Sequence, residues 1–238
     1  MTDNFAGAEF YENPDARCPL LLLLDVSPAM DGAPLAALNR ALAIFAKDLQ
    51  RDPLTRLRVE LAIVAQGTRG RLVNLQNGKS ELDASRDFSG AAGFSPASLS
   101  AGGKAPQSDA VEGCIELIRQ RKAIYRRNGI DFFRPILLLI SSESHAGGES
   151  WSRTAEIIRS QENQKGLSFY QVLVKPPLPA DAENISPLGQ PIFLKDWMFD
   201  EMFEWLYLGL ASLSMRRPAD RINLPAAAEW RSPEPARQ

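Results

Sequence analysis

Five consecutive leucines at positions 20–24, followed directly by Asp25, constrain the fold of this chain more than any other feature. An uninterrupted apolar run of this kind is typical of a strand that is buried on both faces. The segments "RPILLLISS" (134–142) and "GLSFYQVLVK" (166–175) have the same character. Together they predict a parallel sheet that is covered on both sides.

Predicted helices alternate with these strands. We expect strands at about 19–25, 57–67, 134–142 and 166–175, and helices at about 34–50, 106–127, 149–164 and 197–217. Residues 70–76 follow a Gly-flanked connection, which predicts a hairpin and one antiparallel edge strand, and 191–196 is expected to form a short last strand. Residues 77–104 are predicted to form a long surface loop, a feature that is often functional. The expected fold class is a three-layer, doubly wound α/β fold with a mostly parallel central sheet and one antiparallel edge strand.

Composition and charge argue against nucleic-acid and membrane partners. The 238 residues carry a formal net charge of −2, so we do not expect a nucleic-acid partner. The apolar runs are too short to span a bilayer and the first residues lack the pattern of a signal peptide, so no membrane partner is expected either. Cys18 and Cys114 lie far apart without metal-ligand spacing. They indicate reduced thiols and a cytoplasmic location.

The expected domain organisation is simple. We predict an N-terminal extension over 1–17, one domain over 18–216 and a C-terminal tail over 217–238. The first part of the tail is expected to pack through Leu224 and Trp230, and its last residues are expected to be disordered.

Polar residues follow two of the predicted buried strands. Asp25 and Ser27 come after the first, and Ser141 and Ser142 end "ILLLISS". In open parallel sheets ligands bind outside the carboxyl ends of the strands. Asp25 therefore marks a candidate site, although a carboxylate in this position can also be structural and accept backbone N–H groups of the following turn.

Several segments of the chain resemble one family. "LLLLLDVSPAMDGAPLAALN" (20–39) is similar to the first motif of von Willebrand factor type A domains, in which Asp-x-Ser-x-Ser follows the first strand. "AGGKAPQSDAVEGCIELI" resembles the second motif segment. "NGIDFFRP" and "SMRRPADRINLP" resemble the tellurium-resistance-associated, TerY-like subgroup. This resemblance implies a type A fold with a metal-ion-dependent adhesion site.

The ligand set of that site is incomplete in this sequence. Asp25 and Ser27 match the first Asp and Ser of the family, but Ala29 replaces the second Ser, Ala105 the Thr and Ser142 the last Asp. Mg²⁺ and Mn²⁺ require about six oxygen ligands. The resemblance therefore implies a degenerate site without a cofactor, at which Asp25 and Ser27 would hold Mg²⁺ or Mn²⁺ weakly if at all.

Other polar residues near this site are candidates for contact with a partner: Asp31, Lys104, Ser141, Glu143 and His145. Lys104 could place its ammonium group near Asp25, or could be a solvated loop lysine. His145 is the single histidine. A Ser/His/Asp hydrolase would need it as a base, but the sequence lacks a nucleophile elbow, so we do not expect an enzyme.

These observations favour a non-enzymatic, cytoplasmic protein-interaction module that binds a partner protein through loops 26–33, 77–106 and 141–150. The resemblance implies a bacterial stress response of the tellurium-resistance type, with other proteins of such systems or an associated kinase or phosphatase as partners. The alternative is an adhesion-type domain that depends on Mg²⁺ or Mn²⁺ despite its incomplete ligand set.

Overall fold

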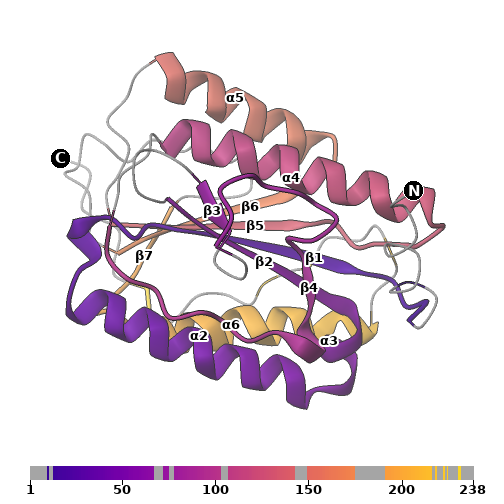
Figure 1. The fold of residues 1–238 in the computed structure, drawn as a ribbon, viewed down its shortest axis with the longest axis horizontal. Helices are drawn as coiled ribbons and strands as arrows, with labels where there is room; N and C mark the ends of the chain where they lie inside the picture. The colour runs from indigo at the N-terminus through magenta and orange to yellow at the C-terminus, as the bar shows by residue number, and fades with distance from the viewer. Residues whose placement is uncertain are drawn as a thin grey trace.

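Strand β1 (Cys18–Leu24) lies inside the central sheet of this computed structural model (Figure 1). The structure describes residues 10, 13–66, 72–74, 78–102, 107–142, 149–174, 191–215, 218, 222, 224, 230 and 231. β1 pairs in parallel with β2 (Val59–Gln66) and β5 (Ile136–Ser141). The parallel strands β6 (Ser168–Leu173) and β7 (Ile192–Phe193) continue the sheet beyond β5, and the order is β3-β2-β1-β5-β6-β7.

Two short strands pair antiparallel with the outer edge of β2. β3 (Leu72–Asn74) lies beside its carboxyl half and β4 (Ser89–Gly90) beside its amino half. The antiparallel edge strand predicted at 70–76 is confirmed. β4 falls within the segment predicted as a loop, because a strand of two residues is too short to produce a periodic pattern.

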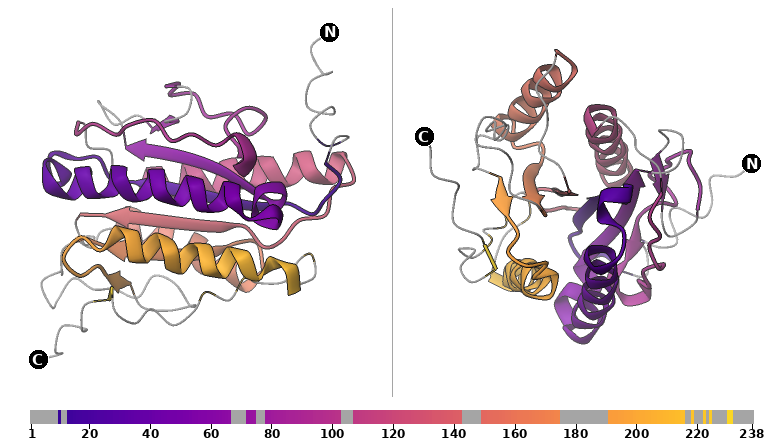
Figure 2. Two further views of the ribbon diagram at one scale, coloured as in Figure 1. Left: turned by 90° about the horizontal axis from the view of Figure 1, so that it is seen from below. Right: turned by 90° about the vertical axis from the view of Figure 1, so that its left-hand side faces the viewer.

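Helices cover both faces of the sheet, as Figures 1 and 2 show. α2 (Ala33–Arg51), α3 (Pro53–Arg58) and α6 (Phe199–Ala211) lie on one face, and α4 (Gln107–Arg127) and α5 (Glu149–Asn163) lie on the other. Three short 3₁₀ helices complete the described elements: η1 (Pro28–Met30), η3 (Ala91–Gly93) and η4 (Ser212–Met215). The predicted three-layer, doubly wound architecture is therefore confirmed.

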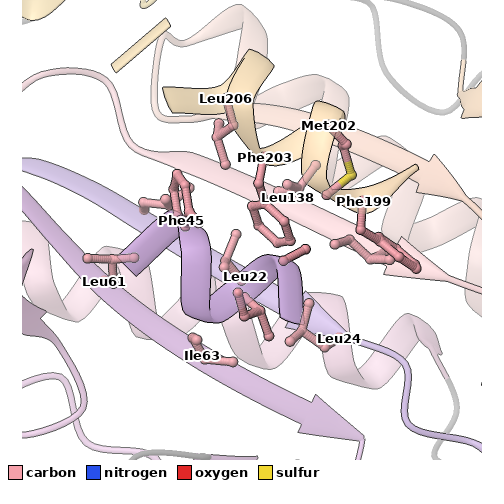
Figure 3. Packing of buried hydrophobic residues seen from close by; sticks show 14 of the residues in the cluster. Leu22, Leu24, Phe45, Leu61, Ile63, Leu138, Phe199, Met202, Phe203 and Leu206 are labelled. Atoms are coloured by element: carbon pink, nitrogen blue, oxygen red, sulfur yellow. The ribbon is translucent and has the colours of Figure 1, made fainter. Parts of the chain in front are cut away.

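The leucines of β1 alternate between two hydrophobic cores. The even-numbered ones pack on the side of α2 and α6, where Figure 3 shows Leu22 and Leu24 in one cluster with Phe45 and Phe203. The odd-numbered ones pack on the side of α4 and α5. Every residue of β1 is buried. Two apolar faces explain why the run contains no polar residue.

Helix α3 corrects one predicted boundary. The sequence predicts a strand from residue 57, but β2 begins at Val59 because the preceding residues are helical. Asp52 is the N-cap of α3, and its side chain accepts the N–H groups of Leu54 and Thr55 at 3.0 and 2.7 Å. Asp followed by Pro is a helix-start signal, but six helical residues show too little periodicity to reveal it.

Helix α6 also ends earlier than predicted. The sequence predicts a helix to residue 217, whereas α6 ends at Ala211 and continues as η4. The Ser212 hydroxyl donates to the Gly209 carbonyl at 2.6 Å. A serine that bonds back to the preceding turn satisfies carbonyl groups at a helix end and favours its tightening into a 3₁₀ turn.

Two amide side chains of α2 hold the described part of the long loop against this helix. Asn39 donates to the Leu99 carbonyl at 3.0 Å and accepts the Leu99 N–H at 2.7 Å. Gln50 donates to the Phe94 carbonyl at 2.7 Å. The Gly102 N–H then donates to the Val26 carbonyl at 2.7 Å, which brings the loop to the carboxyl end of β1.

Residues on both sides of 18–216 belong to the hydrophobic cores. Phe10 is buried in the core beside α4, and Ile222 and Trp230 are buried in the core beside α6. Leu224 packs there too, so both residues that the sequence predicts to fix the tail lie against the domain. The last residues of the tail, predicted to be disordered, lie outside the described residues.

The two cysteines lie on opposite sides of the sheet. Cys18 belongs to the core beside α2 and α6, and Cys114 to the core beside α4. Both are free and buried. Burial raises the pKa of both thiols above the ordinary value, so they remain protonated and unreactive.

Candidate functional site

Asp25 extends the sheet by one hydrogen bond beyond the last residue of β1. Its N–H donates to the Ile140 carbonyl on β5 at 2.9 Å, and the residue is 4% exposed. The carboxylate therefore lies at the carboxyl end of two neighbouring parallel strands, the position at which ligands bind in open α/β sheets.

Both oxygens of the Asp25 carboxylate accept hydrogen bonds from the protein. The backbone N–H of Ser27 donates to Oδ1 at 2.8 Å. The backbone N–H and the hydroxyl of Ser142 donate to Oδ2 at 2.9 and 2.6 Å. Ser142 follows β5, so the side chain of Asp25 joins the ends of both strands.

The two serines of this site also lie close to each other. Their Oγ atoms are 3.4 Å apart, and Ser27 and Ser142 are 5% and 1% exposed. The sequence predicts that Asp25, Ser27 and Ser142 lie at one end of the sheet, and the structure brings them into contact. Their arrangement is a closed hydrogen-bonded cluster with little exposure to solvent.

Ala29, the residue that the sequence resemblance aligns with a second serine, lies in the turn after Ser27. Ala29 lies in η1 and is half-buried, and the Met30 N–H donates to the Ser27 carbonyl at 2.9 Å. Asp31 follows and is exposed, and its Oδ1 accepts the N–H of Gly32 at 2.9 Å. Gly32 has a φ of 80° and precedes α2, a conformation that favours glycine.

Several predicted site residues cannot be placed. Lys104, Ala105, Glu143 and His145 lie outside the described residues. Ser141 is described and fully buried, and its carbonyl accepts the Val174 N–H at 2.8 Å. The prediction that Ser141 offers its side chain to a partner therefore conflicts with its burial, because it is the last residue of a central strand.

The donor set around Asp25 does not fit a hydrated divalent cation. The protein already donates three hydrogen bonds to its two carboxylate oxygens, and Ala29 in the following turn has no side-chain oxygen. A hard cation such as Mg²⁺ requires oxygen lone pairs rather than N–H groups. Among the described residues, no group of three or more His, Cys, Asp or Glu side chains is arranged to hold a metal ion.

A second buried carboxylate lies at the opposite end of the sheet and was not predicted. Glu60 is the second residue of β2 and is 1% exposed. Arg17, which precedes β1, donates from Nε to Oε1 at 3.0 Å. Arg121 of α4 donates from Nε to Oε2 at 2.9 Å, and its Nη2 forms an ion pair with the same oxygen at 2.7 Å. The Tyr125 hydroxyl also donates to Oε2.

These four side chains form what we call the Glu60 cluster: Arg17, Glu60, Arg121 and Tyr125. Phe10 lies over both guanidinium groups, with its ring centroid 5.6 and 5.4 Å from their Cζ atoms. Burial and the Glu60 carboxylate raise the pKa of Tyr125 well above its ordinary value of 10.0. A glutamate inside the apolar segment "VELAIVAQ" is the signal that could have revealed a buried ionic cluster.

Comparison with known proteins gives structural neighbours at low sequence identity. No protein-family model matches the chain, and no curated protein matches its sequence. The pilus adhesin SpaC from Lactobacillus rhamnosus GG, in its open conformation, superposes with a TM-score of 0.55 at 10% identity over 84% of this chain. Proximal thread matrix protein 1 from the mussel byssus superposes with a TM-score of 0.48 at 12% identity over 84% of this chain.

The chain spans 31% of the adhesin and 49% of the mussel protein. At such identities the likeness concerns the fold alone, and the TM-score of the adhesin supports the α/β fold described above. Within the described residues, no helix is long and apolar enough to cross a membrane.

Proposed function

We propose that this chain is a non-enzymatic protein-binding module that recognises a partner protein at the carboxyl end of its sheet, with little or no dependence on a metal ion. The observation that carries this proposal is the closed hydrogen bonding of Asp25 with Ser27 and Ser142. In the family that the sequence resembles, the corresponding carboxylate holds an ion that a partner completes. Here protein donors occupy the same carboxylate.

The energetics favour metal independence. An ion at Oδ2 of Asp25 would compete with the two hydrogen bonds that Ser142 donates to this buried oxygen, and leaving buried donors there without an acceptor costs about 1–3 kcal/mol. Ala29 has no side-chain oxygen that could bind the ion and offset this cost. A hydrated ion held by one carboxylate would not recover this free energy in water.

The exposed surface next to this cluster supplies the contact that we propose. Asp31 is exposed at the end of the 3₁₀ turn, between the buried Met30 and the start of α2. Because rigid elements hold the turn on both sides, a partner meets a preorganised loop and loses little entropy on binding. A basic side chain of the partner is the natural complement of Asp31.

The wider context of the proposal rests on the sequence resemblance. On that resemblance we propose that the chain acts in the bacterial cytoplasm, in a stress response of the tellurium-resistance type. Other proteins of such a system, or an associated kinase or phosphatase, are the partners we propose. The free, buried cysteines support a reducing compartment.

Calorimetric titration of Mg²⁺ and Mn²⁺ into chelator-treated protein tests the metal independence. Asp25→Asn is the matched control, because it keeps an acceptor oxygen and removes the charge. We expect no binding heat up to several millimolar for either protein. Submillimolar binding that Asp25→Asn abolishes would favour the alternative, a metal-dependent adhesion module.

Crosslinking in the native cells, followed by mass spectrometry, tests the partner. We expect Asp31→Arg to remove a crosslinked protein that the wild-type chain captures equally well with chelator and with Mg²⁺. Asp131→Arg is the control, because Asp131 is exposed and precedes β5 at the opposite end of the sheet. Equal capture by both variants would contradict a contact at Asp31.

A further inference from the structure

Trp230 and Arg231, near the C-terminal end of the given sequence, pair with the two residues that follow β7. The Lys195 N–H donates to the Trp230 carbonyl at 2.9 Å, and Leu194 forms an antiparallel bridge with Arg231. Backbone pairing of an extended segment with a strand edge is a recurring way in which proteins recognise peptides. Here the segment comes from the same chain.

The side chain of Trp230 is buried in this contact. It is 4% exposed, and its ring meets that of Trp205 on α6 at a centroid distance of 5.1 Å. Trp205 in turn packs edge-on against Tyr170 of β6, at 6.0 Å. A tryptophan in a desolvated aromatic environment is the usual energetic centre of an interface.

The backbone part of the contact is small. Pairing over two residues contributes little by itself, because short strands are stable only with the packing that accompanies them. Trp230 is connected to η4, which ends at Met215, through the intervening chain. A segment of a partner would therefore compete with a contact made within the chain itself.

We propose that Leu194 and Lys195, which follow β7, form together with the ring of Trp205 a docking site for an extended segment that carries a tryptophan. Residues 230 and 231 occupy this site within the chain and compete with such a segment of a partner protein. The chemistry of the ligand follows from the present occupant: an aromatic ring beside Trp205 and a carbonyl that accepts from Lys195.

This site lies apart from Asp25 and does not depend on the function proposed above. β7 pairs with the carboxyl end of β6, where Phe193 lies opposite Leu173. β6 and β5 separate it from β1 in the sheet. A partner could therefore use both positions, but the loss of one would leave the other intact.

Amide hydrogen exchange of the wild-type chain gives a first test. The Leu194 N–H donates to the Leu173 carbonyl inside the sheet at 2.8 Å, whereas the Lys195 N–H depends on the tail. If the tail opens while the domain stays folded, the Lys195 amide exchanges at least tenfold faster than the Leu194 amide. Equal exchange of both amides, at the rate of global unfolding, would overturn the proposal.

Binding of a peptide with the sequence of residues 226–236 gives the second test. Full-length Trp230→Ala has an empty site, so we expect it to bind the labelled peptide at least tenfold more tightly than the wild-type chain does. A peptide with alanine in place of its tryptophan should bind Trp230→Ala at least tenfold more weakly. Trp197→Ala is the matched control, because Trp197 is 43% exposed, and it should behave as wild type.

Two outcomes would overturn the assignment. The first is a folded Trp230→Ala protein, as judged by circular dichroism, that shows no saturable peptide binding up to about 1 mM. The second is a concentration-dependent wild-type dimer that Trp230→Ala abolishes, because the segment would then come from a second copy. If Trp230→Ala fails to fold, the exchange rates of the wild-type amides decide the question.

Discussion

Two buried carboxylates lie at opposite ends of the same sheet, and the protein stabilises them in different ways. Asp25 accepts hydrogen bonds from neutral groups, the N–H of Ser27 and the N–H and hydroxyl of Ser142. Glu60 accepts from two guanidinium groups and from a phenol. Loss of the Asp25 carboxylate leaves only neutral donors behind, whereas removal of one partner from a buried ionic cluster leaves a charge uncompensated.

The location of the donors adds to this difference. The donors of Asp25 follow strands β1 and β5 in the turns, as expected for a site that meets other molecules. The partners of Glu60 come from the start of β1 and from α4, and Phe10 covers them. Loop positions are typical of binding sites, so the proposed contact with a partner lies at the carboxyl end, and we expect the Glu60 cluster at the amino end to contribute mainly to stability.

Glu60→Leu should produce the largest effect. It leaves the guanidinium groups of Arg17 and Arg121 buried without their carboxylate, and we expect a loss of about 3–5 kcal/mol in the free energy of unfolding. Urea denaturation followed by circular dichroism measures this. The triple variant in which both arginines are also replaced by methionine should recover most of the loss. A triple variant as unstable as the single one would contradict the ionic explanation.

Asp25→Ala should have a smaller effect, because the donors that it leaves behind are neutral. We expect a loss of about 1–3 kcal/mol in the same measurement. Asp25→Asn keeps an acceptor oxygen and should lose less. A loss for Asp25→Ala equal to that for Glu60→Leu would show that the two carboxylates do not differ in the way proposed.

Tyr125→Phe tests the Glu60 cluster through the dependence of stability on alkaline pH. The pKa of Tyr125 is raised in the folded protein, so its contribution to stability is complete below the unfolded pKa of about 10 and is lost as the pH rises from there toward the folded pKa. We expect wild-type stability to fall above pH 10 by up to about 1.4 kcal/mol per pH unit from this group, and Tyr125→Phe to fall less steeply.

At neutral pH, Tyr125→Phe removes one hydrogen bond to a charged group and should cost about 1.5–3 kcal/mol. Tyr207→Phe is the control at high pH. Burial and the nearby Asp52 and Asp48 carboxylates also raise the pKa of Tyr207, but this side chain is half-buried beside α2. Identical alkaline slopes for wild type and Tyr125→Phe would contradict the assignment.

Glu116→Gln should have the smallest effect of the series. Glu116 lies on α4, the helix that carries Arg121, and forms hydrogen bonds with Arg119 and Gln120 at the surface. The bond from Arg119 lowers the pKa of Glu116, so the pair stabilises the fold above pH 4.5 and loses its effect as the pH falls further. We expect no measurable change in the urea midpoint at pH 7, since solvent screens the pair.

Local patterns in the sequence were sufficient for most of the architecture. The leucine run predicts β1 and its two covered faces, because apolar side chains on alternate sides of a strand require apolar neighbours on both. Alternation with helices predicts parallel strands, and these bring Asp25 and Ser142 to the same end of the sheet. The exceptions, α3 and β4, are too short for a pattern to repeat.

The sequence by itself determined the layers, the order of elements and the end of the sheet at which Asp25 lies, since these follow from hydrophobic periodicity. Tertiary structure alone decided the partners. The side chains bonded to Glu60 are 43, 61 and 65 positions away along the chain, and Trp230 meets Trp205 across the edge of the sheet. Such contacts depend on how the elements pack in three dimensions. The local pattern of a segment therefore does not predict which distant side chain will lie beside it.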